Sequence, residues 1–207
     1  MKLMFAPASP FARKVRVAAA ELGLAKELKL EFTEVQPGKP NMPYAEAYNP
    51  LRKIPSLQLD DGSVLFDSTV IAEYLDERAG GGKLIPKGKD RWRVLTAHAL
   101  AQGMCDAAIL MRYETWLRPE SLRWTTWSDD QAGKIKSGLD WFEAHPKELE
   151  GPINLAQIAL GCLLGYLDLR FPQIDWRASH PRLKNWFAEI AKRESFASTP
   201  PDAPKPV

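Results

Sequence analysis

The sequence has few of the residues that build covalent or metal cross-links. Among its 207 residues there are two cysteines and three histidines. Cys105 and Cys162 form no Cys-x-x-Cys pair, and the histidines lack the spacing of metal ligands. Neither a disulfide framework nor a metal site is therefore expected, and both cysteines are predicted to be small buried hydrophobic residues in helices.

An excess of one charge and a long hydrophobic run are missing as well. The net charge is +2 with both signs interspersed, whereas nucleic-acid binding needs a basic stripe. The nearest candidate, Arg13, Lys14 and Arg16, is interpreted as the solvated side of a helix. The N-terminal apolar stretch is too short for a signal peptide, and the run Leu155 to Leu169 is too short to span a bilayer. We therefore expect a cytoplasmic protein with no nucleic-acid and no membrane partner.

The stretch from Asn49 to Leu75 is the most informative part of the sequence. It reads as a short apolar strand, an Asp-Gly turn, a returning strand and a helix capped by Asp67, Ser68 and Thr69. Before it, the patterns predict a buried strand, a helix, a half-exposed strand and a helical turn, at Leu3–Ala6, Pro10–Leu22, Leu28–Val35 and Tyr44–Tyr48. Residues 1–78 are thus predicted to form a βαβαββα domain.

After residue 78 the strand patterns stop. A glycine-rich and proline-containing segment, residues 79–88, is predicted to be a linker. Residues 89–207 are predicted to form an all-helical domain with a proline-rich C-terminal tail, with one helix capped by Asp90 and another opened by a capping box at Ser128. The helix after Asn154 is apolar on all sides, so it is predicted to be the core helix of this domain, with Ile153 and Ile158 at the hydrophobic-staple positions.

Four segments resemble one known family. Ser9–Val15, Asn49–Pro55 and Phe66–Leu75 are similar to the three N-terminal signatures of the cytosolic glutathione S-transferases, and Asn154–Leu160 resembles the capping signature of their helical domain. The four occur in order over nearly the whole chain, which is most similar to the bacterial serine-type members. The resemblance implies a thioredoxin-like N-terminal domain, a helical C-terminal domain and a homodimer. Glutathione would be the co-substrate, lying against the first domain, with a small hydrophobic electrophile between the domains.

The resemblance makes Ser9 the catalytic residue, donating a hydrogen bond to the glutathione thiolate. A thiol with a pKa of about 8.5 is only a few per cent ionised at neutral pH. A hydrogen bond to a charged acceptor contributes about 1.5–3 kcal/mol, which corresponds to a pKa lowered by about one to two units. Without the resemblance, Ser9 is an ordinary N-cap of the helix that begins at Pro10.

The remaining glutathione contacts are also carried over from the family. The Ile54-Pro55 peptide bond is cis there, and the main chain of Ile54 would pair with the cysteinyl backbone of glutathione. Asp67 would face the ligand's ammonium and Ser68, with the neighbouring helix amides, its γ-glutamyl carboxylate. Lys53 would reach the glycyl carboxylate. Many members have glycine where this chain has Arg52, and if that glycine needs a positive φ, Arg52 implies a different local loop.

The residues alone leave two other functions possible. One is a glutathione-binding or protein-interaction module with little turnover on the same fold. The other is a thioredoxin-type reductase, which is disfavoured because Ser9 and Ala12 occupy the positions of the redox cysteines. The sequence does not identify the residues that line the electrophile pocket. Helical spacing does not decide which of four polar or aromatic residues face the cleft: Asp106, Arg112, Tyr113 and Trp116.

Overall fold

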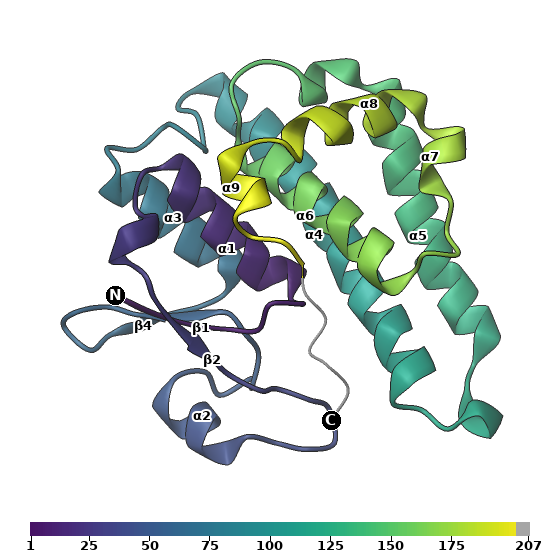
Figure 1. Cartoon of the computed structure of the whole chain (residues 1–207), viewed down its shortest axis with the longest axis horizontal. Coiled ribbons are helices and arrows are strands. Elements are labelled where there is room, and N and C mark those ends of the chain that lie inside the picture. Colours follow the sequence, from purple (N-terminus) through teal and green to yellow (C-terminus); the bar gives the residue numbers. More distant parts are fainter. Residues whose placement is uncertain (202–207) are drawn as a thin grey trace.

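The computed structural model describes residues 1–201 and contains a small sheet with three helices, followed by a bundle of helices (Figure 1). The sheet has the strand order β2-β1-β3-β4. Its strands are β1 (Lys2–Phe5), β2 (Lys29–Phe32), β3 (Ser56–Gln58) and β4 (Val64–Leu65). β1 pairs parallel with β2 and antiparallel with β3, while β3 and β4 form the predicted hairpin. The predicted βαβαββα order is confirmed.

Three helices flank the sheet. α1 (Pro10–Glu21) and α3 (Ser68–Arg78) pack side by side on one face, and α2 (Met42–Ala47) lies on the other (Figure 1). The central strands are fully buried at Leu3 and Leu57, which are direct partners in the sheet. Because α1 also contacts the helical bundle, it is covered on both sides.

The predicted half-exposed strand at Leu28–Val35 is wrong in two respects. The strand is limited to Lys29–Phe32, and all four of its residues are exposed. Even the apolar members are 47% exposed at Leu30 and 59% exposed at Phe32. β2 is the outermost strand of the sheet, and its apolar side chains stay exposed although they alternate as expected.

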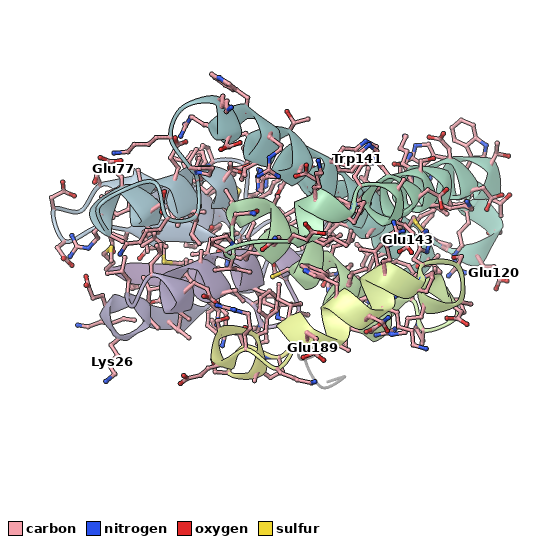
Figure 2. All side chains as sticks on the ribbon, turned by 90° about the horizontal axis from the view of Figure 1, so that it is seen from above. Lys26, Glu77, Glu120, Trp141, Glu143 and Glu189 are labelled. Carbon is pink, nitrogen blue, oxygen red and sulfur yellow. The ribbon has the colours of Figure 1, made fainter. Side chains whose placement is uncertain are left out.

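The second part of the described chain is helical throughout. Its long helices are α4 (Lys89–Trp116), α5 (Thr125–Ala144) and α6 (Leu155–Arg170), followed by the shorter α7 (Trp176–Ser179), α8 (Pro181–Ile190) and α9 (Glu194–Ala197). Every residue from Leu155 to Leu167 is buried, so the prediction of a core helix is confirmed. α6 packs against both α4 and α1 and joins the two parts of the molecule. Charged side chains such as Lys26 and Glu120 point away from this core (Figure 2).

Two predicted helix starts are wrong. α5 begins at Thr125 rather than at Ser128, and its N-cap residue, Trp124, makes no side-chain cap. α4 begins after Gly88, so Asp90 lies in its first turn instead of capping it. In both cases the helix extends beyond the local signal because α4 and α5 pack against each other.

Segment 79–88, predicted to be a linker, is attached to α3 by hydrogen bonds. The carboxylate of the buried Asp76 accepts hydrogen bonds from the N–H groups of Gly82, Lys83, Leu84 and Ile85, at 2.8–3.3 Å. Leu84 and Ile85 are 2% exposed. Leu84 and Ile85 therefore belong to the packed core, and the hydrogen bonds to Asp76 attach the segment to α3.

The interpretation of Arg13 and Lys14 as a solvated helix face is wrong. Arg13 is 5% and Lys14 1% exposed. Arg13 donates hydrogen bonds to the carbonyl groups of Thr199 (2.6 Å) and Phe196 (3.3 Å), so α1 is covered by the chain that follows α9. These hydrogen bonds hold the tail at Thr199, whereas residues 202–207 of the predicted proline-rich tail lie outside the described residues.

One helix of the described chain, α4, is long and apolar enough to cross a membrane by length and composition. In the structure it packs against α5 and α6, and 44% of its most apolar 18-residue stretch is buried. Core helices of soluble proteins pass the same test.

Candidate functional site

Ser9 lies at the N-terminus of α1, directly after the loop that follows β1. Its hydroxyl oxygen accepts a hydrogen bond from the N–H of Ala12 at 3.2 Å, with extended backbone angles, so it is an N-cap. A hydroxyl group that accepts still has its own proton to donate. The half-buried Ser9 therefore keeps one donor free for a ligand, in addition to the positive end of the α1 dipole.

The Ile54-Pro55 peptide bond is cis, as the family resemblance implies. The preceding carbonyl group, of Lys53, accepts hydrogen bonds from the hydroxyl of Tyr44 (2.7 Å) and the side-chain amide of Asn49 (2.8 Å). Within residues 1–201 the N–H and C=O of Ile54 have no hydrogen-bond partner. The loop thus holds an unpaired stretch of main chain just before β3, where a peptide can bind as an added strand.

Arg52 itself adopts a φ of 53°, so the different loop anticipated for an arginine here is not needed. This is the left-handed region, which glycine occupies without steric cost and other residues rarely occupy. Its N–H donates to the carbonyl oxygen of Asn49 at 2.8 Å, which stabilises the turn.

Asp67 and Ser68 start α3 as predicted, but their hydrogen bonds differ in detail. The Asp67 carboxylate accepts from the N–H groups of Thr69 (2.9 Å) and Val70 (3.4 Å). These two amides are therefore occupied by the cap and are not free for a ligand carboxylate. The N–H and hydroxyl of Ser68 remain unpaired within the described residues.

Charged groups from both parts of the molecule influence one another near this helix start. Desolvation raises the pKa of Asp106 on α4; Lys53 and Lys14 oppose this, and Asp67 adds to it. Asp106 therefore faces the first domain, which helical spacing alone did not reveal. The exposed Lys53 stands among these charges, in keeping with its predicted contact to a carboxylate.

Cationic and aromatic groups gather at the C-terminal ends of α4 and α6. The Arg112 guanidinium lies 4.9 Å from the centre of the Trp116 ring, and its pKa is lowered by burial and by Arg170. Burial raises the pKa of Tyr166 to about 12 and also raises that of Tyr113. These groups lie on α4 and α6, and α6 also packs against α1, the helix that begins after Ser9.

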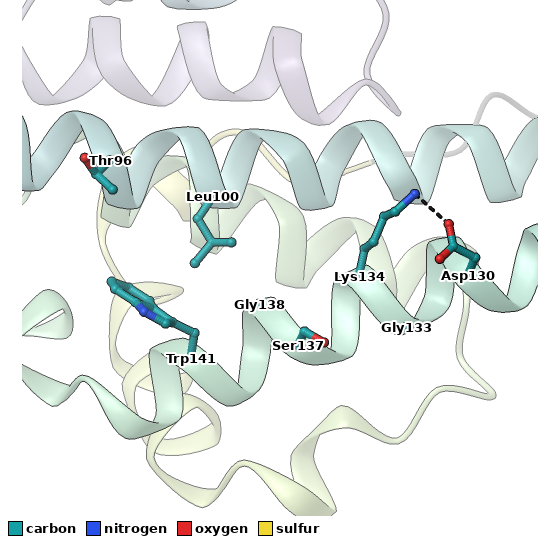
Figure 3. Close-up of a pocket in the computed structure, with 8 residues that line it drawn as sticks. All are labelled: Thr96, Leu100, Asp130, Gly133, Lys134, Ser137, Gly138 and Trp141. Atoms are coloured by element: carbon teal, nitrogen blue, oxygen red, sulfur yellow. Dashed lines mark ion pairs between the residues drawn. The ribbon is translucent and has the colours of Figure 1, made fainter.

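A groove lies elsewhere, between α4 and α5 (Figure 3). It has a volume of about 710 Å³ and is lined by Thr96, Leu100, Trp141 and the ion-paired Lys134 and Asp130, among others. Figure 3 shows it on the side of α4 that faces away from α1. It contains none of the predicted site residues. Among residues 1–201 no group of three or more His, Cys, Asp or Glu side chains is arranged to hold a metal ion.

Comparisons with known proteins agree with this architecture. Family models described as the glutathione S-transferase N-terminal and C-terminal domains match residues 8–78 and 125–189. The chain is 32% identical to an uncharacterised GST-like protein, YibF, of Escherichia coli, over 97% of this chain and 98% of that protein. It is 32% identical to glutathione S-transferase 2 of Saccharomyces cerevisiae, over 91% of this chain and 84% of that protein.

Solved structures give the same picture. A glutathione transferase family member from Pseudomonas fluorescens, crystallised with bound glutathione, has a TM-score of 0.94 and 43% identity, covering 98% of this chain and 99% of that one. A structure from Methylobacillus flagellatus with glutathione bound has a TM-score of 0.85 and 38% identity, covering 97% and 99%.

Proposed function

Because the chain belongs to the glutathione S-transferase family, we propose that it binds reduced glutathione against its first domain and directs the thiolate at a small hydrophobic electrophile. The observation that carries this proposal is the unpaired main chain of Ile54, together with the unpaired donors of Ser68 at the start of α3. A peptide backbone and a carboxylate are the ligand groups that these donors and acceptors fit. The bound glutathione in the related Pseudomonas fluorescens structure supports the same ligand.

The proposed binding mode assigns a protein group to each polar group of the ligand, with Ser68 buried at the start of α3. The cysteinyl amide and carbonyl pair with the main chain of Ile54, which Pro55 follows. The γ-glutamyl carboxylate accepts from the N–H and hydroxyl of Ser68, while the free oxygen of Asp67 accepts from the ligand's ammonium group. Lys53 attracts the glycyl carboxylate. This places both charged ends of the tripeptide against opposite charges.

Ser9 acts on the sulfur atom in this proposal, as in the serine-type members of the family. Its hydroxyl donates to the thiolate, and the N-terminus of α1 adds a favourable partial charge. The anionic sulfur then attacks the electrophile, the leaving group departs with its electron pair, and the conjugate dissociates. Ser9 is never the nucleophile, so it needs no activating base.

The electrophile is proposed to lie beside Tyr113 and Trp116 on α4, whose partly exposed rings offer aromatic surface for a hydrophobic molecule. We also propose that two copies of the chain associate, and that the protein works in the cytoplasm. The exposed Trp92 on α4 and Val70 on α3 support the association. The Arg91–Glu73 ion pair joins the first turn of α4 to the second turn of α3.

Calorimetric titration of reduced glutathione, with ultraviolet absorbance of the thiolate, tests the function. Binding with a thiolate signal at neutral pH is the expected result. Binding without that signal favours the glutathione-binding module with little turnover, and a panel of electrophiles then decides whether turnover exists. No binding at all rejects the site. Disulfide reduction without glutathione would instead favour the reductase.

A further inference from the structure

Lys14 is a lysine buried where three helices meet. Its side chain is 1% exposed. Its ammonium nitrogen lies 2.7 Å from the Gln102 side-chain oxygen, 3.0 Å from His98 Nε2 and 3.4 Å from the Thr69 hydroxyl oxygen. These partners come from α4 and from the first turn of α3. An ammonium group has three N–H donors, so all three are engaged.

The geometry also defines the state of His98. Its Nε2 accepts from the lysine, so the ring is neutral with its proton on Nδ1. Burial and the nearby Lys14 charge lower the pKa of His98 to about 3, in agreement with a neutral ring. The lysine is thus surrounded by neutral acceptors.

No carboxylate lies within 4.0 Å of the Lys14 ammonium among residues 1–201. Buried cations in proteins are normally paired with an anion. The titratable groups that act on Lys14 come from the start of α3, from α4 and from α6: Asp67; His98, Cys105 and Asp106; and Cys162. Burial lowers the pKa of Lys14 to about 8, although the acidic groups partly oppose this.

The position of this charge relates it to the proposed glutathione site. Thr69 directly follows Ser68, and the Thr69 hydroxyl is one of the lysine's acceptors. The ammonium group therefore lies behind the first turn of α3, on the inner side of the donors that would hold the γ-glutamyl carboxylate. The nearest acidic group there, Asp67, already caps the helix and faces the ligand's ammonium.

We propose that Lys14 is a positioning residue whose buried charge attracts the γ-glutamyl carboxylate of glutathione through the N-terminus of α3, so that the ligand completes the charge pairing of the domain interface. This inference rests on the proposed glutathione binding. Through Gln102 and His98 the same ammonium group ties α3 to α4. Ligand binding and domain contact are thereby linked by one side chain.

The proposal predicts the direction in which glutathione affinity changes with pH. Below pH 8 Lys14 is charged and contributes fully to binding. A bound carboxylate favours the charged form and raises the pKa of Lys14. Affinity therefore falls as the pH rises above 8, because the free protein loses the proton that the complex keeps.

The test uses S-methylglutathione, which cannot form a thiolate, and calorimetry at pH 7 and pH 9.5. Lys14→Met replaces the ammonium with an apolar side chain of similar length, and Lys26→Gln removes a charge from an exposed lysine (Figure 2). We expect Lys14→Met to weaken binding roughly tenfold at pH 7, as one partly screened charge would. The difference from the wild type shrinks at pH 9.5, and Lys26→Gln changes little at either pH. Equal affinity of the wild type and a folded Lys14→Met at pH 7 overturns the proposal.

A second measurement needs no variant. In protein with ¹³C-labelled lysine, the Lys14 side-chain resonance is titrated with and without S-methylglutathione. We expect a pKa near 8 that rises by about one unit in the complex. Binding with an unmoved Lys14 pKa rejects the role of Lys14 and leaves the glutathione site intact. Absence of binding to the wild type rejects both proposals.

Discussion

At the scale of single residues, Ser9 combines two tasks in one hydroxyl group. It accepts from Ala12 as the N-cap of α1 and keeps a proton to donate. We expect Ser9→Gly to lower kcat/KM for glutathione conjugation about 10- to 100-fold, the equivalent of one hydrogen bond to a charged acceptor. Glycine is chosen because it costs helix capping only a few tenths of a kcal/mol relative to serine.

The matched variant for this experiment is Ser9→Thr, which keeps the hydroxyl group and the cap. It should retain most of the activity and the thiolate absorbance. If Ser9→Gly forms thiolate at neutral pH as readily as the wild type, Ser9 is an N-cap and nothing more.

The positive φ of Arg52 has a conformational cost that glycine would remove. A left-handed backbone costs a non-glycine residue roughly 1–2 kcal/mol, and part of this is offset because glycine loses more entropy on folding, by roughly 0.5–1 kcal/mol. We expect Arg52→Gly to raise the free energy of unfolding by about 0.5–1 kcal/mol in urea denaturation. The control is Leu51→Gly, at an exposed neighbour with a negative φ, which should destabilise instead. A loss of stability in Arg52→Gly would contradict the strain argument.

At the scale of elements, α6 depends on its cap. The Asn154 side chain accepts from the N–H of Gln157 at 3.2 Å, and the Gln157 side chain donates to the carbonyl groups of Glu148 and Glu150. We expect Asn154→Ala to lower the free energy of unfolding by about 1 kcal/mol, measured by urea denaturation. Asn154→Ser, which retains a capping oxygen, should stay near the wild type. Equal losses in both variants would show that packing, and not the cap, holds the start of α6.

At the scale of the whole molecule, the domain interface should show the cost of burying Lys14. The unfolded lysine, with a pKa of 10.5, remains protonated over a pH range in which the native one, with a pKa of about 8, has lost its proton. Between pH 8 and 10.5 the unfolded state binds more protons, so native stability rises with pH. We expect the unfolding free energy of the wild type to rise by about 3 kcal/mol relative to Lys14→Met between pH 7 and 10.5. A constant difference between the two would contradict it.

Association of two copies is also decided at this scale. Trp92 is 69% exposed and lies on α4 one and two turns before Thr96 and Leu100, which line the groove in Figure 3. We expect the wild type to sediment as a dimer and Trp92→Glu as a monomer, because a carboxylate would be buried in the interface. Trp124→Glu alters a comparably exposed tryptophan (64%) at the start of α5 and should leave the dimer intact. A monomeric wild type rejects the homodimer.

The sequence by itself determined the order of the elements and the character of α6. Apolar periodicity, Asp-Gly and Ser-Pro signals and N-cap residues act within a few positions of the chain, so βαβαββα and the cap at Asn154 were predictable. Three of the four family-like segments also pointed to the proposed glutathione site, because they contain the residues that precede or start α1, β3 and α3.

Only the tertiary structure decided which polar groups are buried and which faces meet. In the sequence Lys14 resembles a solvated lysine, and it is buried because α3 and α4 pack against α1 around it. β2, the outermost strand of the sheet, is exposed despite its alternating pattern. Asp106 turns toward the first domain because α4 packs along α6, and the α6 core in turn contacts α1. These outcomes arise from contacts between residues far apart in the chain, which no local pattern encodes.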